Sequence, residues 1–310
     1  MDDRILQELA IIVLNYKDYN MTIDCVNNLK NLDIDSKIIV VDNNSPNDSF
    51  SILSNKLAGL DNVYIMRTEK NGGYSYGNNE GIKFAIKNFS NIKYIGIMNP
   101  DVFLNTKGML LKICSKLEQY DEIAGITGVT LLNGRLSFGN LGWRVNNVKS
   151  LVLSNFSLLS KVLKTSRSYK SLEMKSDDYE LGYTDVMPGS FFIMKENIFR
   201  EFNYLDEAVF LYFEEEILAR KIKSRGLKSA ILITESYVHK HGSKDTELAN
   251  ISKKKLDYKI YMKSQTYYVE NFVSDNALSK LTLKLSQYIH YYLEIPLICL
   301  MYKFKGMVKR

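Results

Sequence analysis

The chain is short of several residue types, and each shortage excludes a class of protein. Only three of its 310 residues are cysteines, far apart at Cys25, Cys114 and Cys299, so neither a disulfide framework nor a zinc knuckle is expected. No uninterrupted apolar run is long enough to cross a bilayer, and the acidic amino terminus lacks the apolar stretch of a secretory signal. We therefore expect a protein that works in the cytoplasm with reduced thiols.

A recognised nucleic-acid-binding motif is also missing. The net charge of +6 is mildly basic, but lysine and arginine are dispersed, so a nucleic-acid partner is not expected. An anionic membrane surface or a phosphorylated substrate remains open. The hydrophobic content of 45% and charged content of 25% are ordinary for a folded chain of one large or two modest domains.

Short apolar runs alternate with helical patterns in the first half of the chain. The expected strands are 10–14, 37–41, 63–66, 94–98 and 124–127, and the expected helices are 22–32, 49–58, 79–89 and 107–120. Strands that alternate with helices predict an α/β fold with a mostly parallel, Rossmann-like sheet flanked by helices.

Polar residues follow three of these strands, where each strand ends. They are Asn15-Tyr16, the segment 42–46, which begins with Asp42, and Asn99-Pro100-Asp101. Turn formation alone would explain one such cluster. Because ligands bind at the carboxyl ends of parallel strands, three clusters predict a binding edge.

The glycine-rich segment 71–81 precedes an expected helix. The backbone at Gly72 and Gly73 can approach phosphate oxygens, and Asp101 can hold a divalent cation against them. Asn78 and Asn79 stand where a P-loop needs Lys and Ser or Thr, so an ATPase is disfavoured. The spacing does not fit a dinucleotide fingerprint either.

Two further groups carry candidate chemistry. Glu214, Glu215 and Glu216 follow an aromatic run, and on a helix at most one or two of them share a pocket. The alternative is a solvated helix start that complements the helix dipole. His239 and His241, two of only three histidines, flank a predicted strand end and are candidate metal ligands.

Two segments could contact a membrane. Residues 148–170 carry Lys and Arg without an acidic residue, which suits an anionic surface or a helix packed on the sheet. Beyond Asp257 the chain is helical, with one apolar stripe formed by Leu278, Leu281, Leu285, Ile289 and Tyr292. The stripe predicts a helix lying on the cytoplasmic leaflet, a helix buried against the main domain, or a homodimer contact.

Taken in order, these motifs resemble family 2 glycosyltransferases with the GT-A fold, and within them the bacterial rhamnosyltransferases of surface-polysaccharide assembly. The resemblance covers roughly residues 8 to 245. It rests on Leu14-Asn15-Tyr16, the segments 41–45, 71–74 and 77–81, Asn99-Pro100-Asp101, Gly189-Ser190, the segment 211–215 and His239.

The resemblance implies a glycosyltransferase domain over residues 1–255 and a helical, membrane-associating region over 256–310. It implies that Asp42 contacts the nucleotide base and that a nucleotide sugar is bound by Asn15, Asp42, Asn71, Gly72, Gly73, Asn78, Asn79, Asn99 and Asp101. Asp101 matches the last position of the family's metal-binding Asp-x-Asp, whose first position is Asn99 here. Mg²⁺ or Mn²⁺ would then be held by Asp101 with His239 or His241.

The resemblance also implies an inverting reaction, with Glu215 as catalytic base and Glu214 as the second candidate. The expected reaction transfers a hexose, L-rhamnose from dTDP-rhamnose, to a saccharide or polyprenyl-diphosphate-linked acceptor at the inner face of the cell membrane. The alternatives are a UDP-sugar-dependent hexosyl or galactofuranosyl transferase and a non-catalytic polysaccharide scaffold.

Overall fold

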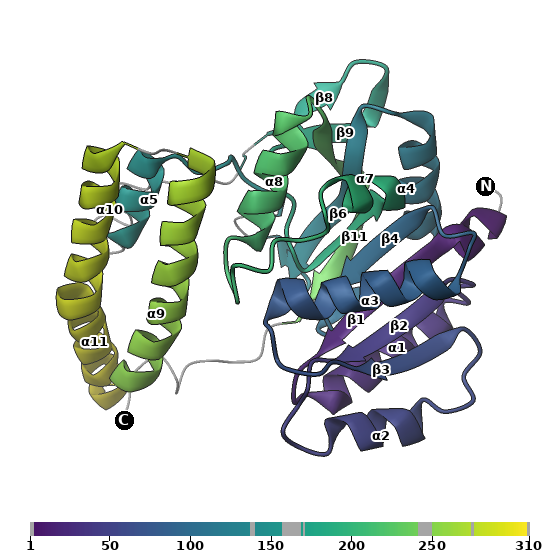
Figure 1. Cartoon of the computed structure of the whole chain (residues 1–310), viewed down its shortest axis with the longest axis horizontal. Coiled ribbons are helices and arrows are strands. Elements are labelled where there is room, and N and C mark those ends of the chain that lie inside the picture. The colour runs from purple at the N-terminus through teal and green to yellow at the C-terminus, as the bar shows by residue number, and fades with distance from the viewer. Residues whose placement is uncertain are drawn as a thin grey trace.

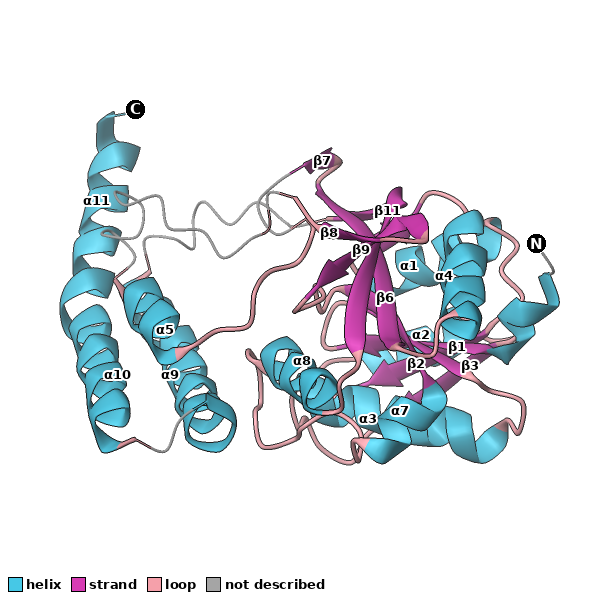
Figure 2. Cartoon of the chain, turned by 90° about the horizontal axis from the view of Figure 1, so that it is seen from above, coloured by secondary structure: helices cyan, strands magenta, loops and turns pink. Residues whose placement is uncertain are grey.

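The chain folds into an α/β part and a layer of helices beside it (Figure 1). The computed structural model describes residues 3–136, 140–156, 169, 171–240, 250–273 and 276–308. Figure 2, seen from above, shows the helical layer standing apart from the sheet, with α8 on the side that faces the layer.

One mixed sheet forms the α/β part. Its strands are β1 (Leu9–Asn15), β2 (Lys37–Asp42), β3 (Val63–Arg67), β4 (Tyr94–Met98), β5 (Val102–Leu104), β6 (Ile123–Leu132), β7 (Arg135–Leu136), β8 (Glu173–Lys175), β9 (Asp178–Thr184), β10 (Phe191–Lys195) and β11 (Lys228–His239). The order is β3-β2-β1-β4-β10-β6-β11-β9-β8, with β1 to β4 parallel to one another and β10 antiparallel to both of its neighbours. This confirms the predicted mostly parallel sheet.

Helices cover both faces of the sheet, because the central strands are apolar on both sides. Leu9, Ile11 and Val13 of β1 face one core, and Ala10 and Ile12 face the other. The first core includes α1 (Tyr19–Asn31), α2 (Ser49–Lys56) and α4 (Gly108–Gln119), and the second includes α3 (Tyr74–Asn88), α7 (Glu196–Glu201) and α8 (Glu214–Ser224).

Helix α3 begins at Tyr74, five residues before the predicted start at Asn79. The predicted boundary was wrong because glycines at 77 and 81 lie inside the helix, where they pack against the sheet. A Cβ at Gly77 would lie 2.4 Å from Leu14 Cδ1, and one at Gly81 would lie 2.5 Å from Ile12 Cγ2. These glycines let α3 lie close to β1, and residues 74–78, including Asn78, belong to the helix rather than to the loop before it.

The helical layer contains α5 (Val148–Asn155), α9 (Ile251–Tyr268), α10 (Ala277–Ile289) and α11 (Ile295–Val308), with π-helical turns at Val269–Val273 and His290–Glu294. Segment 148–170 was expected to pack on the sheet or face lipid, but its described helix α5 packs on α10 instead. Residues 157–168 and 170 lie outside the described residues. The predicted boundary at 255 falls inside α9, which already begins at Ile251.

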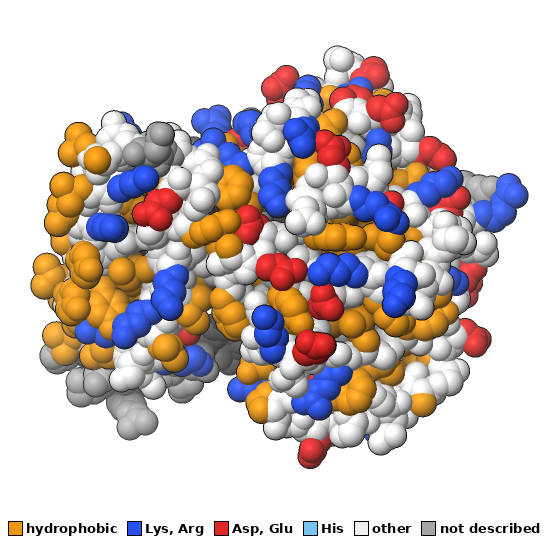
Figure 3. Space-filling model, viewed as in Figure 1, with side chains coloured by type: hydrophobic (Ala, Val, Ile, Leu, Met, Phe, Trp, Pro, Cys, Tyr) orange, Lys and Arg blue, Asp and Glu red, His pale blue; other side chains and the backbone are white. Residues whose placement is uncertain are grey.

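Helix α10 turns a partly polar face inward and an apolar face outward. Ser286 and Gln287 are 2% exposed, whereas Leu285 before them and Tyr288 after them are each 54% exposed. The whole predicted stripe is exposed, so it is not buried against the main domain. We call the exposed apolar side chains of these helices the α10–α11 face (Figure 3): Leu278, Leu281, Leu285, Tyr288, Ile289, Tyr292, Leu293, Leu297, Leu300, Met301 and Tyr302.

Within the described residues, no helix combines the length and the apolar character needed to cross a bilayer.

Candidate active site

The turn after β4 brings a carboxylate to an imidazole. Asp101 lies between β4 and β5, and β5 pairs antiparallel with β11, with Val102 opposite His239. This register puts Asp101 Oδ1 3.1 Å from His239 Nε2, with side-chain exposures of 27% and 14%. The strand pairing therefore joins two candidate ligands that are far apart in the sequence.

The pair fits two neighbouring ligands of one divalent cation. Two ligand atoms about 2.1 Å from an octahedral cation, at a right angle, lie about 3.0 Å apart. Carboxylate and imidazole both suit Mn²⁺-type ions, and Asp101 Oδ1 is buried beside the His239 imidazole. No group of three His, Cys, Asp or Glu suited to a metal occurs in that part of the chain, so phosphate or water oxygens would complete the shell. His241 lies outside the described residues.

Asn15 and Asp42 form a buried link between the carboxyl ends of β1 and β2. Asn15 Nδ2 donates to Asp42 Oδ1 at 2.7 Å, and the backbone N–H of Ser45 donates to Asp42 Oδ2 at 3.0 Å. Arg67 Nε lies 3.5 Å from the same oxygen. Asp42 is fully buried, so these bonds hold the edge rigid. Its contact with a nucleotide base stays a prediction.

Residues 71–73 before α3, here called the glycine loop, contact the segment that leads into α8. Asn71 Oδ1 accepts from Asn43 Nδ2 at 3.1 Å and from the Gly73 N–H at 3.2 Å. The Tyr74 N–H donates to the Phe210 carbonyl at 2.9 Å. Gly73 has φ +92°, and a Cβ there would lie 2.1 Å from that carbonyl oxygen. Glycine is therefore required at 73 by the close approach of two chain segments.

Helix α8 begins with the three glutamates, which diverge as expected. Tyr212 (φ +73°) and Phe213 (φ +70°) adopt left-handed conformations and turn the chain into the helix. Burial, followed by the charge of Glu215, raises the pKa of Glu214 well above its usual value. Glu215 lies against the backbone of Gly189, where a Cβ would fall 2.5 Å from Glu215 Oε1.

The segment Gly189-Ser190 joins the two halves of the site. Tyr74 donates its hydroxyl to the Gly189 carbonyl at 2.6 Å, and burial with the charges of Glu215 and Glu214 raises the pKa of Tyr74. The Asn99 N–H donates to the Ser190 carbonyl at 2.8 Å. The glycine loop, the glutamate pair and the Asp101–His239 pair therefore meet at one edge of the sheet.

Residues 10–201 match the family model described as Glycosyl transferase family 2. The chain belongs to glycosyltransferase family 2. The model spans the glycine loop, Asp101 and Gly189-Ser190, and ends before Glu214 and His239.

A curated relative and solved structures resemble this family 2 glycosyltransferase. The low-salt glycan biosynthesis hexosyltransferase Agl10 of Haloferax volcanii is 24% identical over 213 residues, which cover 68% of this chain and 60% of that protein's length. The mannosyltransferase PcManGT of Pyrobaculum calidifontis, solved with GDP-Man and Mn²⁺, has a TM-score of 0.57 at 10% identity over 97% of this chain and 75% of its own. GalNAc-T7 with UDP, GalNAc and Mn²⁺ has a TM-score of 0.58 at 11% identity, covering 92% and 54%. These structures support the GT-A fold.

Two buried amides of the glycosyltransferase occupy α3. Asn79 donates to the Leu205 carbonyl at 2.9 Å and to Glu207 Oε1 at 2.8 Å, and accepts from the Leu205 N–H at 3.0 Å. Asn78 Nδ2 bonds the Tyr74 carbonyl at 3.0 Å, while its buried Oδ1 has no donor among the described residues. Asn79 thus anchors the segment that leads to Glu214.

Glu216 joins the α/β part of the glycosyltransferase to the helical layer, a role that the sequence did not reveal. Its Oε1 accepts from Trp143 Nε1 at 2.9 Å and from the side-chain amide of Asn146. Its Oε2 accepts from the Asn146 N–H at 3.0 Å and from the Tyr268 hydroxyl at 3.4 Å. The lone tryptophan was the one available signal, because the N–H of a partly buried indole needs an acceptor.

Proposed function

We propose that this family 2 glycosyltransferase moves a hexose from a nucleotide-diphosphate sugar to a hydroxyl of a saccharide or lipid-linked saccharide, with inversion. The observation that carries the proposal is the Asp101–His239 pair, joined through Ser190 and Gly189 to the glycine loop and the Glu214–Glu215 pair. A site with a pair of candidate cation ligands and a nearby carboxylate suits displacement of a diphosphate leaving group.

Each group has a distinct task in that reaction. Asp101 and His239 would hold Mg²⁺ or Mn²⁺, which neutralises charge on the departing diphosphate. Glu215 takes the proton of the acceptor hydroxyl. As it does so, the hydroxyl oxygen of the acceptor bonds to the anomeric carbon of the donor sugar from the face opposite the diphosphate. The sugar–phosphate bond breaks with its electron pair leaving on the diphosphate, and the configuration inverts. Glu214, buried and with a raised pKa, favours its neutral form and is the weaker candidate base.

For the donor, we propose L-rhamnose from dTDP-rhamnose, with a UDP-sugar as the alternative. The support is the motif resemblance over roughly residues 8 to 245. The relative Agl10 is described as a hexosyltransferase without a named donor, and the two structural neighbours were solved with GDP-Man or with UDP and GalNAc. A panel of dTDP-, UDP- and GDP-sugars, scored for transfer and hydrolysis by mass spectrometry, identifies the donor.

The test of the catalytic proposal is Glu215→Gln. Loss of the base should lower turnover at least about 100-fold, which is about 2.7 kcal/mol in barrier. Exposed Glu201→Gln is the matched control and should keep the parent rate. A loss below about tenfold would show that Glu215 is not the base. Calorimetry with dTDP, UDP and Mn²⁺ is run in parallel, and failure to bind either nucleotide would instead favour a scaffold.

We also propose that the α10–α11 face lies on the inner leaflet of the cell membrane. Lysines outnumber acidic residues over 250–310, and Lys280 and Lys284 flank the exposed leucines of α10. An apolar face beside lysines suits an anionic lipid surface. Cosedimentation with phosphatidylglycerol vesicles should exceed that with phosphatidylcholine vesicles. A stable dimer that does not bind either vesicle would show that a second copy covers the face.

A further inference from the structure

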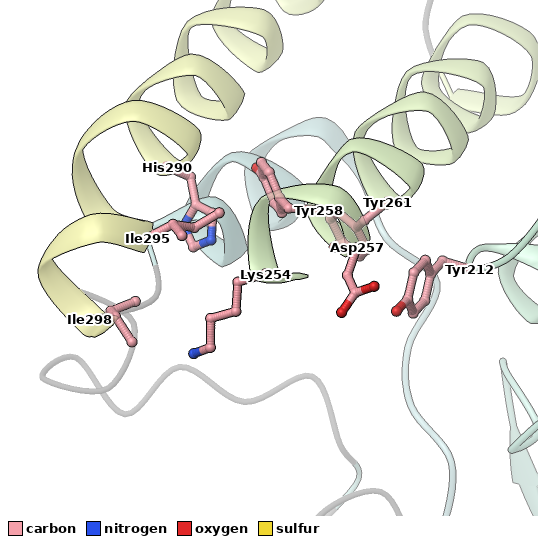
Figure 4. Close-up of a pocket in the computed structure, with 8 residues that line it drawn as sticks. All are labelled: Tyr212, Lys254, Asp257, Tyr258, Tyr261, His290, Ile295 and Ile298. Atoms are coloured by element: carbon pink, nitrogen blue, oxygen red, sulfur yellow. The ribbon is translucent and has the colours of Figure 1, made fainter. Parts of the chain in front are cut away.

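A pocket outside the proposed donor site opens between α9, the segment before α8 and the start of α11 (Figure 4). Its volume is about 270 Å³, near the lower limit of small-molecule pockets, which run from roughly 300 to 1,000 Å³. It is therefore sized for a compact group. Its lining residues are Tyr212, Lys254, Asp257, Tyr258, Tyr261, His290, Ile295 and Ile298.

Aromatic rings form one wall of the pocket. Tyr258 and Tyr261 stack with centroids 5.7 Å apart and planes 20° apart, and Tyr212 meets Tyr261 edge-on at 5.6 Å. The Tyr258 hydroxyl donates to Asn155 Oδ1 at 3.0 Å, which fixes that ring. The wall is thus a preformed apolar surface that costs little conformational entropy to use.

Polar groups line the open side. Figure 4 shows the Asp257 carboxylate, the Lys254 ammonium and the Tyr212 hydroxyl pointing to the same side of α9. His290 Nδ1 lies 2.8 Å from Glu294 Oε2, in a π-helical turn of the kind often found at functional sites. The pocket thus offers a carboxylate acceptor and cationic and hydroxyl donors beside an apolar wall.

The pocket adjoins the proposed catalytic pair. Tyr212 lines it two residues before Glu214, and burial with the charges of Asp257 and Glu214 raises the pKa of Tyr212. Ser264 Oγ of α9 donates to the Leu211 carbonyl at 2.7 Å, which holds this segment on the helical layer. A ligand in the pocket would therefore reach toward Glu214 and Glu215 from the side of the helical layer.

We propose that this pocket binds one sugar ring of the acceptor. A pyranose has an apolar C–H face that packs on aromatic rings, and neighbouring hydroxyls that donate to a carboxylate and accept from an ammonium. A bare phosphate group suits the site less well, because Asp257 would repel it. The inference rests on the proposed glycosyl transfer and assigns its acceptor subsite.

The test is saturation-transfer NMR of the whole protein with a panel of methyl glycosides, including rhamnoside, mannoside, galactoside and N-acetylglucosaminide. At least one glycoside should receive saturation from the protein. Its signal should fall about fivefold or more in Asp257→Asn and in Tyr212→Leu. Exposed Asp24→Asn on α1 removes the same charge elsewhere and should match the parent.

Two results would overturn the pocket proposal: no glycoside receives saturation, or the signal is equal in parent, Asp257→Asn and Tyr212→Leu. Titration of the same samples with dTDP or UDP and Mn²⁺ separates this failure from that of the transferase proposal. Nucleotide binding without pocket-dependent glycoside binding rejects the pocket alone. Pocket-dependent glycoside binding without nucleotide binding supports the pocket and counts against glycosyl transfer.

Discussion

The two parts of the molecule use their apolar residues in opposite ways. In the α/β part, β1 buries Leu9, Ile11 and Val13 on one face and Ala10 and Ile12 on the other. In the helical layer, α10 instead buries a polar network: Gln287 donates to Gln265 at 2.8 Å, and Asn155 donates to Ser286 at 2.9 Å. Its leucines largely face outward. The apolar residues of the sheet build the fold, whereas the layer buries a smaller apolar cluster and leaves the α10–α11 face exposed.

This difference divides the proposed function in the same way. The proposed cation ligands and the proposed catalytic glutamates lie at the sheet edge, while the aromatic pocket and the α10–α11 face lie on the layer. Substitutions at the sheet edge should therefore change chemistry, and those on the layer should change acceptor or membrane binding. Each prediction below tests that division.

The largest effect is expected for Asp101→Asn at the sheet edge. Loss of the carboxylate should lower turnover by about 100- to 1,000-fold, or roughly 3–4 kcal/mol, because charge on the leaving diphosphate is no longer neutralised. Titrations of dTDP or UDP with and without Mn²⁺ should show that the metal no longer tightens binding. Exposed Asp48→Asn is the control. Nucleotide binding that still tightens with Mn²⁺ as in the parent would reject Asp101 as a ligand.

The next prediction compares two leucines of α10. Leu283 is 1% exposed and Leu285 is 54% exposed, so the same truncation should have opposite consequences. Leu283→Ala should lower the free energy of unfolding by about 3 kcal/mol through lost burial and a cavity. Leu285→Ala should change stability by less than about 0.5 kcal/mol and weaken binding to anionic vesicles about tenfold. Equal vesicle binding by both variants would contradict an outward-facing membrane surface.

Sequence reasoning predicted the sheet and the polar residues at the ends of its strands because apolar runs and polar strand ends are local signals, while ligand binding at that edge stays a prediction. It also brought Asp101 and His239 together as candidates, through the family resemblance. It missed the start of α3, because glycine punctuates loops but also permits close helix–sheet packing. It predicted the apolar stripe of α10 but not that the stripe is exposed, since a periodic pattern defines one face of a helix without showing what covers that face.

The different contacts of Glu215 and Glu216 could not be predicted either, because the two residues belong to a run of three consecutive glutamates. Which glutamate meets Gly189 and which meets Trp143 depends on contacts more than 20 residues away along the chain. Such tertiary contacts leave no trace in local spacing.

The junction between the two parts should respond to Glu216→Gln. The amide would present a donor where the carboxylate accepts from Trp143, Asn146 and Tyr268, so the unfolding free energy should fall by about 2 kcal/mol. Unfolding can be followed by the fluorescence of Trp143, the lone tryptophan, which lies at this junction. The exposed pair Glu201–Arg225 supplies the control, and Glu201→Gln should cost less than about 1 kcal/mol. An unchanged unfolding midpoint would mean that the junction does not depend on this carboxylate.

Glu214 should give the smallest effect and one of opposite sign. Its Oε2 is buried without a donor among the described residues, and burial with the charge of Glu215 raises its pKa well above 4.5. The folded state therefore holds a proton that the unfolded state releases above about pH 4.5, so stability falls as pH rises from there to the folded pKa. Glu214→Gln removes the ionisable group and with it this fall in stability at high pH. Its thermal midpoint should equal the parent's near pH 4 and exceed it by about 2 °C at pH 8, or roughly 1 kcal/mol. Exposed Glu270→Gln should follow the parent at both values, and a difference for Glu214→Gln that stays constant with pH would mean that folding does not raise the pKa of Glu214.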